Sequence, residues 1–288
     1  MFTKEPPAIW HIYSDGTRSD IPFGREQDKC YVWNSIAICA WQSDVTLLVV
    51  TVNDTHFHLL CEGTAHAVSY FQDRLRQRLH RNLRKQGKNE TIFLSCDKVE
   101  ERTAILAKFM YVYRNCLDFY NKLPGEYPWG CGNIYFSEKK GFYKGTELSD
   151  LSYREYREYF MTHKKLPDEW RCDAIGRILP ECFIDYESVE RLFGSVRAFI
   201  AFLYIRKEDE SALRQEVNKT YMEQRNIMDL RRIGNELSLS RHSRQLAHTS
   251  LADRLSIASQ MIRQGISGKN ASLAKALYLL PEDLKHLL

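Results

Sequence analysis

The sequence predicts an α+β protein in which a first half containing strands is followed by a helical second half. Residues 45–52 form an apolar, β-branched run (VTLLVVTV) that is typical of a buried strand. Between residues 98 and 122, apolar side chains recur at spacings of three and four, which predicts a helix. Beyond about residue 144 the segments are long, charged and helix-like, with few strand signals. A chain of 288 residues suits one or two domains.

Two histidines follow the apolar strand. They are His56 and His58, within the stretch DTHFHLL at residues 54–60. Because side chains two apart in a strand share a face, both imidazoles project the same way, close enough to bind one metal ion. Phe57 and Leu59 would then face a core on the other side. The alternative is that backbone or carboxylate groups satisfy both rings without a metal.

The helix over residues 98–122 carries Tyr111 and Asn115, which are four apart and therefore share one helical face. If that face meets the histidine strand, the site holds two nitrogen ligands, an amide oxygen and a phenol. A metal ion there would polarise a phosphodiester and a tyrosine would attack it. The alternative is a tyrosine that packs and an asparagine in solvent. The rival nucleophiles are Tyr113, Tyr70 and Tyr120.

In this order the motifs resemble those of the IS200-like single-tyrosine (HUH, Y1) transposases, most closely the branch associated with repetitive extragenic palindromes. Two of the shared features are HFHLL after an apolar strand and YxxxN on a later helix. The third is the segment Tyr127-Pro128-Trp129-Gly130, where such proteins carry a Tyr-Pro-Trp-Ser turn. The resemblance covers residues 8–137.

The resemblance implies a ferredoxin-like antiparallel sheet with helices, and it assigns the elements in order. Residues 9–13 match the first strand, and residues 26–43 match the first helix. The apolar strand and the histidine strand come next. A helix over residues 65–85, a short strand near residues 91–94 and the tyrosine helix complete the domain.

Three positions depart from the family pattern. Asp54-Thr55 stands where Pro-Asn or Asp-Asn usually precedes the first histidine, and Cys116 stands where a proline is common after the asparagine. Residues 88–97 replace a glycine-rich, arginine-containing stretch before the tyrosine helix. The candidate ligands and nucleophile are kept, so these departures bear on how a substrate is recognised more than on the chemistry.

The placement of charge is more informative than the formal net charge of +4. Basic residues crowd the helix that follows the histidine strand, where they could contact DNA phosphates. The alternative is a solvated helix surface. The candidate DNA-binding residues are Arg74, Arg76, Arg78, Arg81, Arg84 and Lys85.

Cysteine usage and hydropathy predict a reduced, cytoplasmic setting without a membrane partner. The eight cysteines include no Cys-x-x-Cys pair, which argues against a structural zinc ribbon. No secretory segment begins the sequence, and no apolar run reaches the length that spans a membrane.

Residues 144–288 are expected to form a helical extension of a catalytic domain at residues 1–143. A linker rich in glycine and lysine is expected at residues 139–145. Helices are expected over residues 151–163, 188–205 and 208–235.

The last forty residues suggest a helix-turn-helix. Ser250 can cap a helix over residues 251–264, Gly265 can end it, and Pro281 can open a final helix. A DNA-binding motif of this kind would offer Arg263, Ser272 and Lys275 to DNA. The same punctuation also fits a plain helical cap.

Together the motifs predict a single-stranded DNA endonuclease and strand transferase. Mg²⁺ or Mn²⁺ would be held by His56, His58 and Asn115, because mixed nitrogen and oxygen ligation with open positions suits these ions. Tyr111 would attack phosphorus and a 3′-hydroxyl would leave, so the 5′-phosphotyrosine bond would keep the energy for rejoining. The resemblance implies single-stranded or hairpin DNA as the partner, and a monomer or a homodimer.

Two other functions fit parts of the sequence. One is a domesticated, catalytically inactive relative that binds DNA hairpins without metal and forms no covalent product. The other is a hydrolytic enzyme in which His56 and His58 bind zinc and water is the nucleophile. That enzyme needs a third strong ligand and a base, which no His-Glu-x-x-His motif supplies.

Overall fold

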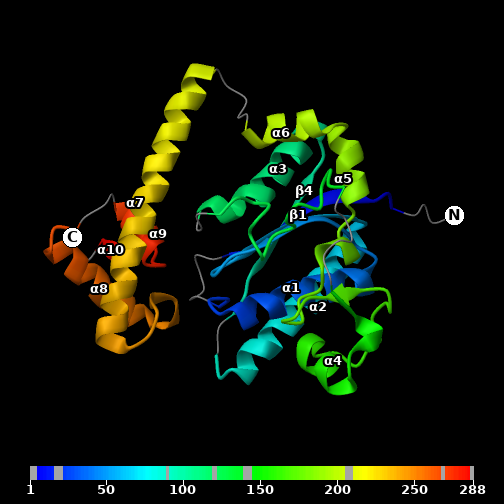
Figure 1. Cartoon of the computed structure of the whole chain (residues 1–288), viewed down its shortest axis with the longest axis horizontal. Coiled ribbons are helices and arrows are strands. Elements are labelled where there is room, and N and C mark those ends of the chain that lie inside the picture. The colour runs from blue at the N-terminus through cyan, green and yellow to red at the C-terminus, as the bar shows by residue number, and fades with distance from the viewer. Residues whose placement is uncertain are drawn as a thin grey trace.

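The computed structural model describes residues 5–15, 22–88, 91–118, 122–138, 145–204, 210–266 and 270–285. Over these residues the chain is a mixed α+β protein built on a four-stranded antiparallel sheet, as the sequence predicts (Figure 1). The strands are β1 (Ala8–Ser14), β2 (Thr46–Val52), β3 (Phe57–Gly63) and β4 (Leu94–Val99), in the order β2-β3-β1-β4. The two inner strands are β3, which pairs with β2 and β1, and β1, which pairs with β3 and β4.

Helices cover both faces of this sheet. The helices α1 (Glu26–Ser43) and α2 (Ala65–Lys85) lie on one face, and α3 (Arg102–Arg114) lies on the other (Figure 1). The observed bounds of α1 and α2 confirm the expected helices. A short 3-10 turn, η1 (Asn115–Asp118), continues α3.

The last strand and the tyrosine helix begin later than expected. The strand expected near residues 91–94 is β4, which runs over residues 94–99. Residues 98 and 99, expected to begin the tyrosine helix, therefore belong to the strand, and α3 begins at Arg102. The backbone N–H of Ile92 donates to Nε2 of His80 on α2 at 3.0 Å, so this N–H does not bond to the sheet. Pairing with β1 then runs from Leu94 to Val99.

Residues 145–204 pack against the first half of the chain. They include β5 (Thr146–Glu147), η2 (Leu148–Asp150), α4 (Tyr153–Phe160), β6 (Arg171–Cys172), η3 (Pro180–Cys182), α5 (Tyr186–Phe193) and α6 (Val196–Tyr204). The helix expected over residues 188–205 is thus two helices, separated by Gly194, whose φ is +78°. Side chains of α5 and α6 join the core of the sheet domain, where Phe193 and Phe199 pack with Phe109 of α3.

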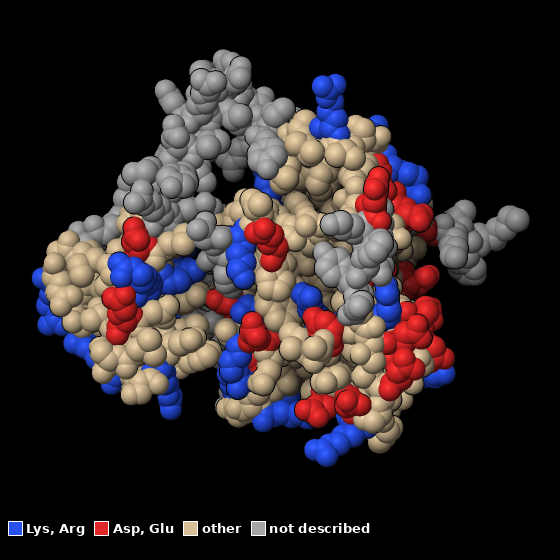
Figure 2. Space-filling view, viewed as in Figure 1, with Lys and Arg blue, Asp and Glu red and all other residues tan. Residues whose placement is uncertain are grey.

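Surface charge is unevenly spread on the face shown in Figure 2. Acidic side chains gather along the edge of the molecule where α5 and α4 lie, and basic side chains are scattered over the rest of this view. No continuous basic tract crosses the described part of this face.

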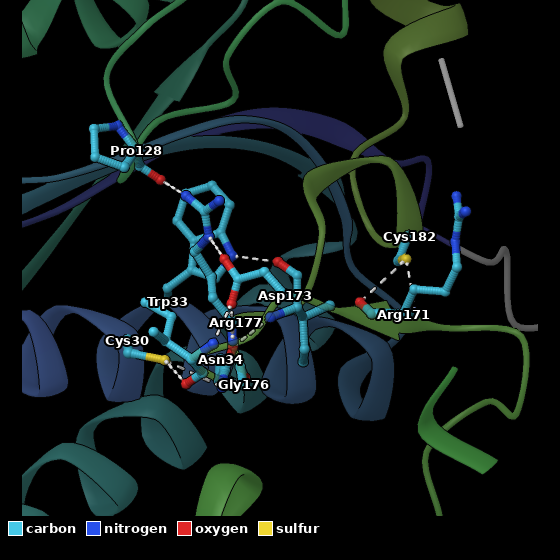
Figure 3. Close-up of polar contacts among 11 residues, drawn as sticks. Cys30, Trp33, Asn34, Pro128, Arg171, Asp173, Gly176, Arg177 and Cys182 are labelled. Atoms are coloured by element: carbon cyan, nitrogen blue, oxygen red, sulfur yellow. Dashed lines mark hydrogen bonds and ion pairs between the residues drawn. The ribbon is translucent and has the colours of Figure 1, made fainter. Parts of the chain in front are cut away.

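Buried polar contacts hold the loop before η3 against α1 (Figure 3). Trp33 Nε1 donates to the carbonyl of Ile178 at 2.8 Å. Asn34 donates through Nδ2 to the carbonyl of Gly176 at 2.8 Å and accepts from the N–H of Ile178 at 2.9 Å. Asn34 is 1% exposed, so these two bonds replace water for both backbone groups.

The C-terminal helices form a module with its own hydrophobic core. They are α7 (Glu210–His242), α8 (Leu251–Arg263), α9 (Asn270–Ala276) and α10 (Pro281–Leu284), with the 3-10 turn η4 (Leu246–His248) between α7 and α8. Ser250 caps α8 by accepting from the N–H of Asp253 at 3.2 Å, Gly265 follows with a φ of +71°, and Pro281 opens α10. These three sequence predictions are confirmed.

One expected DNA contact in this module is wrong. Ser272 is buried, because α9 packs against α7, and so it is not available to DNA. Arg263 and Lys275 are exposed. The expected turn at residues 268–270 falls mainly on residues 267–269, which lie outside the described residues, as does the expected linker apart from Gly145. Among the described helices, none has both the length and the apolar character needed to cross a membrane.

A buried polar network ties the C-terminal module to the sheet domain. Tyr278 donates its hydroxyl to Oδ2 of Asp54 at 2.9 Å, and Lys29 of α1 forms an ion pair with Oδ1 of Asp54 at 2.6 Å. Arg254 of α8 donates to the carbonyl of Tyr278 at 2.8 Å. Asp54 lies two residues before His56, so the module is anchored beside the candidate site.

Asn34→Ala should lower the free energy of unfolding by about 2–4 kcal/mol, because it leaves the carbonyl of Gly176 and the N–H of Ile178 buried without partners. Urea unfolding followed by circular dichroism measures this change. Asn133→Ala, at an exposed position, is the matched control and should change the free energy of unfolding by less than about 0.5 kcal/mol. Equal stability of the two variants would contradict the role given to Asn34.

Candidate active site

The candidate site lies where the turn between β2 and β3 meets the C-terminal end of α3. The turn is closed by a hydrogen bond from the N–H of Asn53 to the carbonyl of His56 at 2.8 Å. His56 ends the turn, and His58 is the second residue of β3, opposite Thr51 on β2 and Tyr13 on β1. The turn thus fixes one histidine and the sheet fixes the other.

Helix α3 is held in place by contacts on both of its sides. Thr51 Oγ1 on β2 donates to the carbonyl of Val112 at 2.8 Å. On the far side Phe109 and Tyr113 pack into an aromatic cluster with Tyr135 and Phe199. These contacts leave Tyr111 on the remaining side of the helix, where it is 44% exposed.

The rival tyrosines are placed differently. Tyr113 is 7% exposed and donates its hydroxyl to the carbonyl of Gly132 at 3.1 Å, so it does not face the histidines. Tyr70 lies on α2, across the sheet from α3 (Figure 1). Tyr120 lies outside the described residues. Among the described candidates, Tyr111 is therefore the one that contacts the histidine strand.

His56 and Asn115 come together although 59 residues separate them in the sequence. Nε2 of His56 lies 3.1 Å from Oδ1 of Asn115. Nδ2 of Asn53 donates to the same oxygen at 2.5 Å and lies 3.3 Å from His56 Nε2. On the other edge of the ring, Thr55 Oγ1 lies 2.8 Å from His56 Nδ1. Thr55 can accept a hydrogen from Nδ1, which leaves the lone pair on Nε2.

His58 meets the candidate nucleophile directly. The hydroxyl of Tyr111 lies 3.5 Å from Nε2 of His58, and the two rings are nearly perpendicular with centroids 5.1 Å apart. The ring of His56 lies 5.0 Å from that of His58, also nearly perpendicular. Lys108, one helical turn before Tyr111, places its ammonium group 5.3 Å from the centre of the phenol ring. The sequence prediction for these two histidines, Tyr111 and Asn115 thus describes groups that the fold brings together.

A third histidine, His11 on β1, supports His58 from behind. Its Nε2 lies 3.1 Å from Nδ1 of His58, and its Nδ1 lies 4.0 Å from a carboxylate oxygen of Asp97 on β4. Nδ1 of His11 is buried without a hydrogen-bond partner among the described residues, and in one of the two tautomer pairs its Nε2 accepts from Nδ1 of His58. Nε2 of His58 then keeps its lone pair toward Tyr111. No motif in the sequence identified His11, although His11 and Tyr13 lie two apart on β1, as His56 and His58 do in the chain.

Burial keeps both of these strand histidines neutral. It lowers the pKa of His58 to about 2, with smaller contributions from the nearby His56, His11 and Lys108. It also lowers the pKa of His11 to about 4, again aided by Lys108. Neutral imidazoles are the form that binds metal ions. A group that holds a proton so weakly is a poor general base for a phenol, which favours a ligand role for His58.

The unusual residues before His56 have structural partners. Asp54 is bonded to Lys29 and Tyr278, as described above.

The segment Tyr127-Pro128-Trp129-Gly130 lies against the end of β2. The carbonyl of Trp129 accepts from the N–H of Val52 at 2.8 Å, and Tyr127 donates its hydroxyl to the carbonyl of Val52 at 2.7 Å. Both contacts fix the start of the turn that carries Asn53 and His56.

The basic residues of α2 lie across the sheet from Tyr111, so the structure does not bring them to the site (Figure 1). Three of them are held by neighbouring groups. Arg74 donates to Gln42 at 2.7 Å, Arg76 pairs with Asp73, and Arg78 donates to the carbonyl of Phe160 at 2.8 Å. The other three are exposed: Arg81, Arg84 and Lys85.

The histidine pair lacks a third strong ligand of the kind that zinc prefers. Within the described ranges, no three His, Cys, Asp or Glu side chains are grouped so that they could hold a metal ion. The third donor beside His56 is the amide oxygen of Asn115. Two imidazoles and one amide oxygen do not supply the four nitrogen or sulfur ligands of a closed structural zinc site.

Between pH 6.5 and pH 4, the free energy of unfolding of the metal-free protein should fall as the pH falls. Unfolded histidines take up protons near pH 6.5, whereas the folded state holds the pKa of His11 at about 4 and that of His58 at about 2. Unfolding therefore takes up protons in this window, and each of the two histidines contributes about 1.4 kcal/mol per pH unit. Urea unfolding at several pH values in EDTA measures the slope.

His11→Gln should remove about half of the contribution that the two histidines make to the slope of unfolding free energy against pH, because one of the two buried rings is gone. His66→Gln replaces an exposed histidine on α2 and should leave the slope unchanged. If His11→Gln and His66→Gln give the same slope as the unaltered protein, the buried neutral pair is not the cause.

Comparison with family models, with curated proteins and with solved structures finds no match to this chain. Membership of the single-tyrosine transposase family therefore stays a prediction from the sequence motifs.

Proposed function

We propose that this protein is a metal-dependent single-stranded DNA endonuclease and strand transferase whose nucleophile is Tyr111. One observation carries the proposal: a phenol, two imidazoles and an amide oxygen meet at the end of α3. Tyr111 and His58 are 53 residues apart in the sequence, and His56 and Asn115 are 59 residues apart, so no local motif accounts for these contacts. A core tyrosine would be expected to bury its hydroxyl, whereas Tyr111 is 44% exposed.

The arrangement of the sheet domain supports the same proposal. Its element order, β-α-β-β-α-β, is that of the ferredoxin-like motif, which the family resemblance implies. The first half of this repeat is β1-α1-β2 and the second is β3-α2-β4, and α3 follows the repeat on the other face of the sheet. The histidine strand therefore lies within the sheet, where pairing on both sides fixes His58.

The donor set fits a divalent cation such as Mg²⁺ or Mn²⁺, held by His56, His58 and Asn115. The 3.1 Å between His56 Nε2 and Asn115 Oδ1 is close to the separation of about 3 Å between adjacent ligands of an octahedral ion with bonds of about 2.1 Å. With the hydrogen of His56 on Nδ1, toward Thr55, both atoms can offer lone pairs to a cation, and both are held by neighbours. A bound cation would supply positive charge to a phosphate oxygen and so favour attack on phosphorus.

In the proposed reaction, Tyr111 is the nucleophile and Lys108 stabilises the charge that develops on it. Tyr111, on the exposed side of α3, attacks the phosphorus of a single strand; its phenolic proton passes to solvent, and the departing 3′-oxygen takes up a proton in exchange. Lys108 provides positive charge beside the phenol as it becomes a phenolate. One phosphorus–oxygen bond forms to Tyr111 and one breaks, which releases a 3′-hydroxyl and leaves a 5′-phosphotyrosine. Attack by another 3′-hydroxyl reverses the step and joins two strands.

The partner and setting follow from the resemblance. We propose single-stranded or hairpin DNA as the substrate, in the cytoplasm, bound by a monomer or homodimer. The exposed cations Arg81, Arg84 and Lys85 lie across the sheet from Tyr111 and could contact a DNA segment away from the break. A relative that binds hairpins without cleaving them is the alternative that the experiment separates.

The full-length protein should form a covalent adduct with DNA that needs Mg²⁺ or Mn²⁺ and Tyr111. End-labelled single strands copied from the DNA flanking its own gene are incubated with protein and metal, and a denaturing gel detects protein joined to the 5′ side of the break. Tyr111→Phe should abolish the adduct, because it removes the attacking oxygen and leaves the exposed ring in place.

Tyr113→Phe is the matched control, since it makes the same change two residues away on the same helix, and it should keep the adduct. An adduct that survives Tyr111→Phe would reject the nucleophile assignment. Binding of hairpins without an adduct in either metal would favour the inactive DNA-binding relative.

A further inference from the structure

Asn53 is an asparagine of the site that no sequence motif identified. It is the residue after β2, and its side chain is fully buried. The N–H of its backbone is bonded to the carbonyl of His56, which fixes the residue at the start of the turn. Its side chain therefore points into the site from a rigid base, between His56 and Asn115.

The amide of Asn53 is satisfied on one side only. Its Nδ2 contacts Asn115 Oδ1 and His56 Nε2, whereas its Oδ1 is buried without a hydrogen-bond partner among the described residues. A buried, unpaired amide oxygen is costly and unusual in a native protein. The contacts with Asn115 and His56 are thus what keeps the amide in this orientation.

Three polar atoms of the site form a small triangle. The sides are 2.5 Å from Asn53 Nδ2 to Asn115 Oδ1, 3.1 Å from Asn115 Oδ1 to His56 Nε2, and 3.3 Å from His56 Nε2 to Asn53 Nδ2. These lengths bracket the separation of about 3 Å expected for adjacent ligands of an octahedral Mg²⁺ or Mn²⁺. The nitrogen and oxygen of an amide differ by a rotation of the group, so either atom can occupy this corner.

We propose that Asn53 is a further ligand of the cation, with its amide turned so that Oδ1 faces His56 and Asn115. This inference rests on the proposed function, because it extends the same metal site. An NH₂ group cannot bind a cation, and an amide oxygen can, so metal binding itself favours the turned amide. Four protein ligands leave part of a six-coordinate shell open for a phosphate oxygen of the substrate.

The competing explanation is that Asn53 only orients Asn115 through its hydrogen bond. Removing either a ligand or a supporting hydrogen bond weakens metal binding, so Asn53→Ala does not separate the two roles. Asn53→Asp separates them by the sign of its effect. An added carboxylate ligand strengthens cation binding, whereas a carboxylate in place of the NH₂ donor repels Asn115 Oδ1 and spoils its orientation.

The test measures the affinity of the full chain for Mn²⁺ by isothermal titration calorimetry, and electron paramagnetic resonance checks the concentration of free Mn²⁺. Asn53→Asp should bind Mn²⁺ about tenfold more tightly than the unaltered protein, and Asn53→Ala about tenfold more weakly. His56→Ala should abolish binding and so locate the ion. Asn82→Asp adds the same charge on α2, across the sheet, and should leave the affinity unchanged.

Unchanged or weaker Mn²⁺ binding by Asn53→Asp would overturn the ligand role and leave the proposed function standing. Absence of Mn²⁺ binding by the unaltered protein would overturn both. If Asn53→Asp does not fold without metal, thermal unfolding across a series of Mn²⁺ concentrations replaces titration. A steeper rise of the unfolding temperature in this variant than in the unaltered protein supports the proposal, and a shallower rise rejects it.

Discussion

The candidate site depends on how α3 is held against the hairpin of β2 and β3. The bond from Thr51 to the carbonyl of Val112 joins the helix to β2, and the aromatic cluster around Phe109 and Tyr113 presses it from the far side. With the helix fixed in rotation and height, its spacing of four residues sends Tyr111 toward His58 and Asn115 toward His56. A rotation of α3 about its axis by the angle between successive residues, about 100°, would separate the phenol from the imidazoles.

The electrostatics of the site follow from the same packing. His11 and His58 lie on one face of the sheet beneath α3, and burial there favours their neutral form. Because the folded state keeps both rings neutral while the unfolded state can protonate them, the free energy of unfolding falls at low pH. Neutral rings keep a nitrogen lone pair that can bind a metal ion. The network of Lys29, Asp54 and Tyr278 adds a second constraint, since it links the C-terminal module to the turn that carries His56.

Periodicity within one element explains what the sequence could predict. Spacings of two in a strand and four in a helix fixed which side chains share a face, so His56, His58, Tyr111 and Asn115 could be identified in pairs. Contacts between elements were harder. His11 reaches His58 from another strand, and Asn53 in the β2–β3 turn reaches Asn115 at the end of α3. Just before β4, the N–H of Ile92 bonds to the side chain of His80 on α2, a contact that periodicity does not reveal. The basic run on α2 was visible, but the sequence could not show that it faces away from Tyr111.

The central claim is that the fold gathers cation ligands beside Tyr111, and a crystal of the full-length protein grown with Mn²⁺ tests it most directly. Anomalous scattering from manganese locates the ion independently of any assumed chemistry. The account predicts a peak within bonding distance of His56 Nε2, His58 Nε2 and Asn115 Oδ1, next to the hydroxyl of Tyr111. Manganese found only elsewhere on the protein, with these side chains still bonded to one another, would contradict it.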